Sequence, residues 1–256
     1  MLENINSFGT ALYKYGLQNK RVAVVGHNSY EWAVAHLSNL LGGIVSVPLD
    51  KGLQLGELES SLIRSRVQAI VFDEKLKDVI KEIKKNNKTS IKYYICTSKI
   101  PDFLYFYDLL LNGRDDIEKG YLEYVNHKVD SYKMSILLFT SGTTSKSKAV
   151  MLNQYGIATN VYDMQLVESF YDNDVNIAFL PYHHIFGSTG MLVMLASGVK
   201  TVFPDGLKYI QKNLVEYKVS VFVGVPVLID KMHSTIIKEL EKQGKPFVTR
   251  LALIPA

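Results

Sequence analysis

Short apolar runs alternate with amphipathic segments in the first hundred residues of the chain. The run at 21–25 ends at Gly26, which predicts a strand followed by a turn. Ser29 then precedes apolar residues spaced three and four apart, which predicts a helix with one buried face and a serine cap. The same alternation predicts strands at 44–49, 69–72 and 91–96 and helices at 55–63 and around 76–83.

A polar stretch with several turn residues, 112–116, precedes a second alternation of the same kind. Here the pattern predicts strands at 136–139, 148–152, 175–180, 199–203 and 219–223, and helices near 154–168, 187–196, 207–217 and 226–243. Apolar strands that alternate with amphipathic helices indicate mostly parallel sheets covered on both faces. We therefore expect an α/β fold of layered, mostly parallel β-sheets flanked by helices, with lobes at 1–134 and 135–256.

Composition and charge narrow the class of protein. With 256 residues, of which 47% are hydrophobic and 21% charged, the chain can bury the core of an ordinary globular protein. Its formal net charge of +4 does not argue for a nucleic-acid partner. The single cysteine, Cys96, excludes an internal disulfide and a cysteine-based metal cluster. Its place in an apolar run predicts an unreactive core thiol.

The sequence carries no clear targeting or membrane segment. Residues 1–4 lack the features of a signal peptide, and the longest apolar stretch, 190–199, is too short to span a bilayer. We therefore expect a cytoplasmic protein. The lysines around the helix expected near 76–83 are more typical of a solvated helix face than of a patch for an anionic surface.

The run from 137 to 148 carries the clearest chemistry. After an apolar strand, the chain reads Thr140, Ser141, Gly142, Thr143, Thr144, Ser145, Lys146, Ser147 and Lys148. Small residues let backbone N–H groups converge on an oxyanion, hydroxyls add donors, and a lysine reaches terminal phosphates as a point charge. The pattern predicts a cradle for a nucleoside triphosphate, with a polar turn between two strands as the alternative.

Two other enzyme motifs fit this loop poorly. A Walker A loop aligned on its glycine and final lysine would need glycine at Ser147 and a hydroxyl at Ala149. It would also lead into a helix, whereas the next segment is apolar and predicts a strand. A serine-hydrolase elbow would need glycine two residues before Ser141, where Phe139 stands.

A second candidate site follows the strand expected at 175–180. His183 and His184 come after a Leu-Pro pair at the strand end, where open α/β sheets place their ligand sites. A metal-binding pair is disfavoured because no further His or Cys stands at ligand spacing, while a histidine packed in a turn stays open. Three aspartates near strand ends are expected to act as turn or cap residues: Asp50, Asp73 and Asp205.

Three segments in order resemble the adenylate-forming superfamily, which contains acyl-CoA synthetases, luciferases and peptide-synthetase adenylation domains. The loop at 140–148 resembles its phosphate loop. Gly42 to Asp50 resembles its Gly-Gly-x-x-x-x-Pro-Leu-Asp block, and Phe179 to Gly187 its Leu-Pro-x-x-His-x-x-Gly block. The last block and the helix expected at 226–243 are most similar to the long- and medium-chain fatty acyl-CoA ligase branch. Together the blocks span most of 20–230 and are more specific than any one alone.

The resemblance implies ATP-dependent activation of a carboxylic acid, expected to be a fatty acid, to an acyl-adenylate and then to acyl-CoA. It implies ATP, Mg²⁺ and CoA, and loose contact with a membrane surface is compatible with a fatty substrate. It assigns phosphate binding to Thr140, Ser141, Gly142, Thr143, Thr144 and Lys148. It also implies catalytic roles for Lys148 and His184, and it implies that His184, Phe186 and Gly187 shape the acyl pocket. No metal ligand is assigned.

Two departures from the family pattern bear on activity. The loop usually continues Gly-x-Pro-Lys-Gly, whereas this chain keeps only the lysine, in the order Ser145, Lys146, Ser147, Lys148 and Ala149. The family's adenine, ribose and hinge blocks and its small C-terminal domain are expected to lie beyond Ala256. We therefore expect an N-terminal portion of a ligase that is inactive alone. A non-catalytic nucleotide- or partner-binding module and a purely structural fragment are the alternatives.

Overall fold

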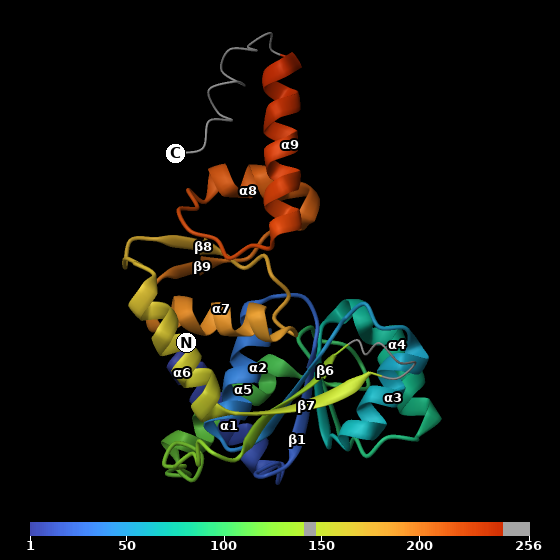
Figure 1. Cartoon of the computed structure of the whole chain (residues 1–256). Helices are drawn as coiled ribbons and strands as arrows, with labels where there is room; N and C mark the ends of the chain where they lie inside the picture. The colour runs from blue at the N-terminus through green and yellow to red at the C-terminus, as the bar shows by residue number, and fades with distance from the viewer. Residues whose placement is uncertain (141–146, 243–256) are drawn as a thin grey trace.

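The computed structural model describes residues 1–140 and 147–242 and contains a seven-stranded sheet in the order β5-β4-β3-β1-β2-β6-β7 (Figure 1). Every neighbouring pair is parallel except the antiparallel β6–β7 hairpin. The strands are β1 (Arg21–Val25), β2 (Val45–Leu49), β3 (Ala69–Phe72), β4 (Tyr93–Cys96), β5 (Leu104–Tyr105), β6 (Met134–Thr140) and β7 (Lys148–Asn153). The mostly parallel α/β sheet expected from the sequence is confirmed.

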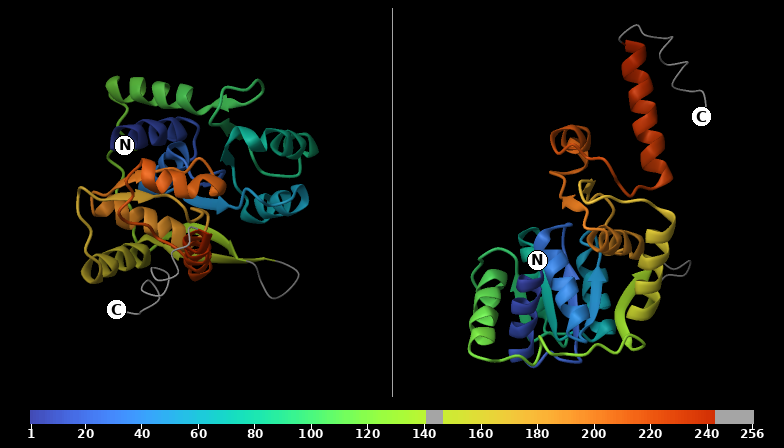
Figure 2. Two further views of the ribbon diagram at one scale, coloured as in Figure 1. Left: turned by 90° about the horizontal axis from the view of Figure 1, so that it is seen from above. Right: turned by 90° about the vertical axis from the view of Figure 1, so that its left-hand side faces the viewer.

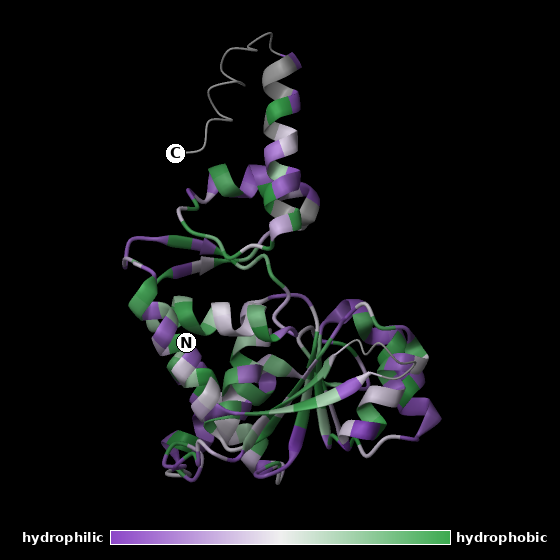
Figure 3. Cartoon of the chain, viewed as in Figure 1, coloured by the Kyte–Doolittle hydropathy of each residue, from purple (hydrophilic) through white to green (hydrophobic). Residues whose placement is uncertain are grey.

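Helices cover both faces of this sheet, because alternate residues of a strand point to opposite sides. On β1, Val22 and Val24 join a core with α1, α2 and α5, whereas Ala23 and Val25 join a second core with α3 and α4. Figure 3 shows green along most of the length of the inner strands of the large sheet. The helices are α1 (Leu2–Lys14), α2 (Tyr30–Leu41), α3 (Leu55–Ser65), the short η1 (Glu74–Leu76), α4 (Lys77–Asn86) and α5 (Phe106–Glu118).

The stretch 112–116, expected to be a turn region, lies inside α5 instead. Gly113 explains the difference, because a Cβ added there would lie 1.8 Å from the carbonyl oxygen of Ser7 in α1. The missing side chain lets the two helices approach closely. Gly113 is therefore a packing residue within a helix, and the prediction of a turn was wrong.

After β7 the chain adds a smaller unit, most of which lies above the large sheet in Figure 1, while α6 runs beside the sheet. Its two parallel strands, β8 and β9, form a separate sheet. Figure 2 shows α9 projecting away from the rest of the molecule. The elements are α6 (Gln154–Val167), β8 (Val175–Ile177), α7 (Ile185–Ala196), β9 (Lys200–Val202), η2 (Leu207–Tyr209), α8 (Ile210–Glu216) and α9 (Pro226–Lys242). Within the described ranges, no helix has both the length and the apolar character needed to cross a bilayer.

Two features of this half differ from the sequence pattern. The strand expected at 219–223 is reduced to a single bridge between Asn176 and Val221. β6, which was expected to open the second lobe, pairs with β2 through Ser46 and Ile136. The large sheet therefore crosses the expected boundary at 134–135 and continues to the end of β7, and the smaller unit follows.

Candidate functional site

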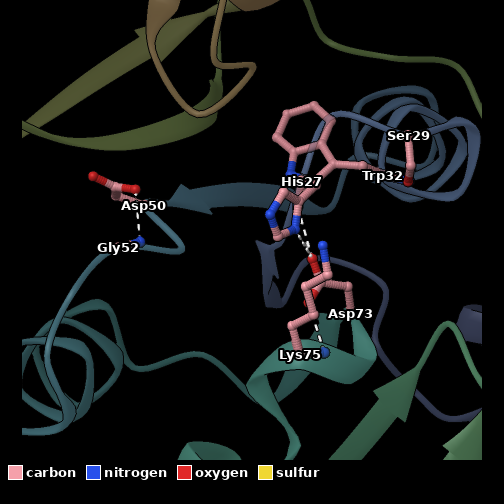
Figure 4. Close-up of polar contacts among 7 residues, drawn as sticks. All are labelled: His27, Ser29, Trp32, Asp50, Gly52, Asp73 and Lys75. Atoms are coloured by element: carbon pink, nitrogen blue, oxygen red, sulfur yellow. Dashed lines mark hydrogen bonds and ion pairs between the residues drawn. The ribbon is translucent and has the colours of Figure 1, made fainter. Parts of the chain in front are cut away.

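The carboxyl ends of the inner strands β1 and β3 meet at a small crevice of about 10 Å³ (Figure 4). β1 leads into α2 on one face of the sheet and β3 leads towards α4 on the other, which is the arrangement that opens ligand crevices in α/β folds. His27 from the first loop and Asp73 from the second point toward each other there. Nδ1 of His27 lies 2.6 Å from Oδ2 of Asp73.

Asp73 fixes both loops of this crevice. Its Oδ2 also accepts a hydrogen bond from the backbone N–H of His27 at 2.8 Å, and its Oδ1 accepts one from Lys75 N–H at 3.1 Å. The second bond caps η1, so the prediction that Asp73 is a cap residue is confirmed. The partnership with His27 was missed, because it becomes visible only when β1 and β3 are known to be neighbours.

Asn28, in the loop that follows β1, connects the carboxyl end of that strand to the smaller unit. Its Nδ2 donates to the carbonyl oxygens of Ala178 at 2.9 Å and Leu180 at 2.7 Å. Its Oδ1 accepts from the backbone N–H of Tyr182 at 2.9 Å. The Tyr182 ring packs near Trp32 of α2, with ring centroids 5.4 Å apart, and burial raises the Tyr182 pKa above its usual range. One side chain thus holds the turn that precedes the two predicted site histidines.

The two histidines of this turn have different environments. The His183 side chain is only 10% exposed, and its Nε2 lies 3.7 Å from Oδ1 of Asp50. That nitrogen has no hydrogen-bond partner among the described residues. Burial lowers the pKa of His183 to about 4, although the Asp50 carboxylate acts in the opposite direction. His184 is exposed at the N-cap of α7, and the centroid of its ring lies 4.3 Å from the centroid of the His183 ring. Of the two, His184 is therefore the solvent-accessible one.

The expected phosphate loop joins β6 to β7. Thr140 and Lys148 are partners across this antiparallel hairpin, so the two ends of the loop leave the sheet side by side. The strand that follows confirms the context that argued against a Walker A motif. Four residues of the predicted site lie outside the described part of the chain: Ser141, Gly142, Thr143 and Thr144.

A largely apolar groove of about 530 Å³ opens among β7, α6 and α7. Its lining includes Met151 of β7, Ile157 of α6 and Phe186 of α7. The Phe186 side chain is 51% exposed there. Gly187 is buried, and a Cβ added to it would lie 2.2 Å from the carbonyl oxygen of Pro181. Its missing side chain allows α7 to begin close to the turn.

The predicted site residues thus gather in two places. Thr140 and Lys148 stand at the tip of the hairpin, and His184, Phe186 and Gly187 stand at the start of α7. No hydrogen bond joins the two groups within the described residues. β7 connects them, because it begins at Lys148 and contributes Leu152 to the groove, and alternate residues of a strand share a face. At about 3.3 Å per strand residue, these two positions are roughly 13 Å apart.

Comparison with known proteins extends this picture. A family model described as "AMP-binding enzyme" matches residues 1–252. Long-chain-fatty-acid–CoA ligase 5 of Rattus norvegicus is 24% identical over an alignment of 259 positions, which covers 93% of this chain and 37% of that protein. Medium-chain acyl-CoA ligase ACSF2, mitochondrial, of Danio rerio is 26% identical over 224 residues, with 79% and 37% covered. The chain spans about 37% of the length of these relatives.

Solved structures share the fold. A long-chain-fatty-acid-CoA ligase (FadD1) from Archaeoglobus fulgidus matches with a TM-score of 0.76 at 20% identity, covering 94% of this chain and 46% of that one. A red-emitting luciferase from Phrixothrix hirtus matches with a TM-score of 0.77 at 20% identity, covering 88% and 44%. At this identity, the likeness concerns the arrangement of the strands and helices.

Proposed function

The chain belongs to the AMP-binding enzyme family, and from this premise we propose that it is part of a ligase that activates a carboxylic acid with ATP. The proposed products are an acyl-adenylate and then an acyl-CoA. Two similar proteins are named as long- and medium-chain acyl-CoA ligases, which supports a fatty acid as the acyl donor. Because the chain spans about 37% of their length, the reaction is proposed for a protein of the relatives' size.

One observation carries the proposal beyond the family. β7 begins at Lys148, beside the predicted phosphate loop, and its later residues line the apolar groove together with Phe186. An extended acid lying along this strand would present its carboxylate toward the phosphates while its hydrocarbon chain enters the groove. Burial of that chain supplies binding energy of about 0.8 kcal/mol per CH₂ group.

The proposed chemistry proceeds in two displacements. A carboxylate oxygen attacks the α-phosphorus of ATP in line, and the bond to the bridging oxygen breaks, so pyrophosphate leaves with the electron pair. The CoA thiolate then attacks the acyl carbonyl carbon, and AMP leaves. Catalysis of this kind depends mainly on positioning and charge neutralisation.

The chain's own residues would serve the first displacement. Lys148 would hold the β- and γ-phosphates through its charge, and Thr140 would donate its hydroxyl. His184 and Phe186 would shape the entry of the acyl chain, while Gly187 would support the start of α7. Magnesium, when bound, would neutralise charge on the phosphates. Within the described residues no group of three His, Cys, Asp or Glu could hold a metal, so no ligand for it is assigned here.

The test measures ATP-dependent stabilisation of the chain against thermal unfolding, and fatty-acid-dependent exchange between ATP and pyrophosphate. We expect ATP to stabilise the chain, by about 2.7 kcal/mol at a hundredfold excess over its Kd, without measurable exchange. Lys148→Ala should abolish the stabilisation, whereas Lys200→Ala, at the exposed start of β9, should retain it.

Each outcome of this test has a distinct meaning. Exchange that disappears in Lys148→Ala would show that the chain is a complete adenylation site, which contradicts the expected inactivity of the isolated chain. Stabilisation by ATP without binding of a fatty acid would favour a non-catalytic nucleotide-binding module. No stabilisation at any ATP concentration would refute a nucleotide role for this part of the protein.

A further inference from the structure

An arginine from the first half of the chain holds the end of the predicted phosphate loop. Arg64 lies in the last turn of α3. Its Nη1 donates to Ser147 Oγ at 3.0 Å, and its Nη2 donates to the carbonyl oxygen of the same residue at 2.8 Å. Two parallel hydrogen bonds from a planar guanidinium fix the orientation of the partner as well as its position.

The same guanidinium reaches the other strand of the hairpin. Its central carbon lies 5.2 Å from the centroid of the Phe139 ring, which is a cation–π distance. Phe139 precedes Thr140 at the end of β6, and Ser147 precedes Lys148 at the start of β7. Arg64 therefore contacts the hairpin on both sides of the loop.

Lys148 needs such a support. β7 is the edge strand of the large sheet and pairs only with β6 among the described strands. Lys148 is exposed at its first position, where a strand begins to fray. A lysine acts as a point charge on a flexible stem, so its reach toward a phosphate depends on where its backbone is held.

We propose that Arg64 is a positioning residue for the phosphate site. It fixes Ser147, and through the following peptide bond it sets the direction from which Lys148 extends. The role in phosphate binding rests on the proposed function, whereas the restraint on the hairpin does not. Because Arg64 is exposed, its contribution lies in the geometry of the site more than in the stability of the fold.

The first experiment measures the restraint without nucleotide. Trypsin cleavage after Lys148 is followed by mass spectrometry in the full chain and in Arg64→Gln, Arg64→Lys and Ser147→Ala. We expect cleavage roughly threefold to tenfold faster in Arg64→Gln, because hydrogen bonds to a charged donor are lost. Arg64→Lys should also cleave faster, since one ammonium cannot reproduce both bonds. Ser147→Ala, which keeps the carbonyl acceptor, should give a smaller change.

The control for this experiment is Arg66→Gln. Arg66 caps the same helix and makes no hydrogen bond with Ser147 among the described residues, so its substitution should leave the cleavage rate unchanged. Unchanged cleavage in Arg64→Gln would overturn the proposal, and so would an equal acceleration in Arg66→Gln. Adding Ser147→Ala to Arg64→Gln should have little further effect, because the hydroxyl has already lost its partner.

The second experiment compares the Kd for ATP with the Kd for AMP in the same variants. If Arg64 positions the contact with the β- and γ-phosphates, both Arg64→Gln and Arg64→Lys should weaken ATP binding about fivefold. Binding of AMP should be unchanged in both variants. Retained ATP affinity in Arg64→Lys with loss in Arg64→Gln would show a charge effect and overturn the positioning role. If the wild-type chain binds no ATP, the proposed function fails, and the cleavage result still decides whether Arg64 restrains the hairpin.

Discussion

Oδ1 of Asn28 accepts a hydrogen bond from the backbone N–H of Tyr182 at 2.9 Å, across 154 positions of sequence. The amide nitrogen of the same side chain donates hydrogen bonds to two backbone carbonyl oxygens just before that turn. The turn that leads into α7 is therefore built against the edge of the large sheet. Because His184 stands at the N-cap of α7, its position depends on a residue of the β1–α2 loop.

Replacing Asn28 with alanine should destabilise the protein by about 2–4 kcal/mol. The change removes three hydrogen bonds and leaves partly buried backbone groups without partners. Urea unfolding measures the loss. Asn112→Ala, at an exposed position of α5, is the matched control and should change stability by less than about 0.5 kcal/mol. A similarly small change in Asn28→Ala would contradict the role given to this side chain.

His183 should make stability depend on pH. Burial lowers its folded pKa to about 4 from an ordinary value of 6.5, with Asp50 opposing and His184 and Lys51 assisting that shift. Between these values the unfolded chain binds a proton that the folded chain does not. The contribution of the neutral, buried His183 to the free energy of unfolding is therefore fully present above pH 6.5 and is lost as the pH falls toward 4. Its size is on the order of 3 kcal/mol.

The comparison of variants isolates this histidine. His183→Asn should flatten the plot of unfolding free energy against pH between 4 and 6.5. Some slope will remain, because burial also lowers the pKa of His36 to about 3 and acts with the same sign. His233→Asn, at an exposed position of α9, should leave the plot unchanged. An unaltered slope in His183→Asn would show that this histidine is not buried in its neutral form.

Much of the fold could be predicted from the sequence, because a strand buried on both faces is a continuous apolar run. The run at 69–72 is an example, since all four residues of β3 are buried. α1 was not among the predicted helices, and its buried face includes the small residues Gly9 and Thr10 beside the apolar ones. The turn expected at Gly113 failed because glycine serves close helix packing as well as turns.

The candidate site could be predicted only where its residues are neighbours in sequence. The loop that ends at Lys148 and the turn with His184 are local patterns of this kind. The pair of His27 and Asp73 depends on β1 lying beside β3, which no local pattern specifies. The contacts of Arg64 likewise join segments 83 positions apart. Long-range contacts of this kind require the topology of the folded chain.

Gly113→Ala should destabilise the protein by about 3 kcal/mol, although alanine is the better helix former. The added methyl group would overlap the carbonyl oxygen of Ser7, so α5 and α1 would have to move apart. Gly56→Ala is the matched control, because Gly56 lies in α3 with no atom within 4 Å of an added Cβ. That substitution should stabilise by up to about 1 kcal/mol. Thermal unfolding of both variants measures the difference, and a loss in Gly56→Ala equal to that in Gly113→Ala would refute the packing explanation.

Phe186→Ala should weaken binding of a fatty acid to this chain without destabilising it. The Phe186 ring lines the apolar groove and is 51% exposed, so it contributes little to the core of the protein by itself. A bound hydrocarbon chain would cover the exposed part of the ring, and burying about half of such a side chain is worth roughly 1–1.5 kcal/mol, close to a tenfold change in Kd. Titration with a fluorescent fatty acid measures this change.

Leu166→Ala is the control, since Leu166 lies on α6, is 67% exposed and stands outside the groove lining. An equal effect of the two substitutions would show that the probe binds nonspecifically to apolar surface, and no effect of Phe186→Ala would remove the groove as the acyl site. A loss confined to Phe186→Ala, with unchanged thermal unfolding, would place the hydrocarbon chain beside the strand that begins at Lys148.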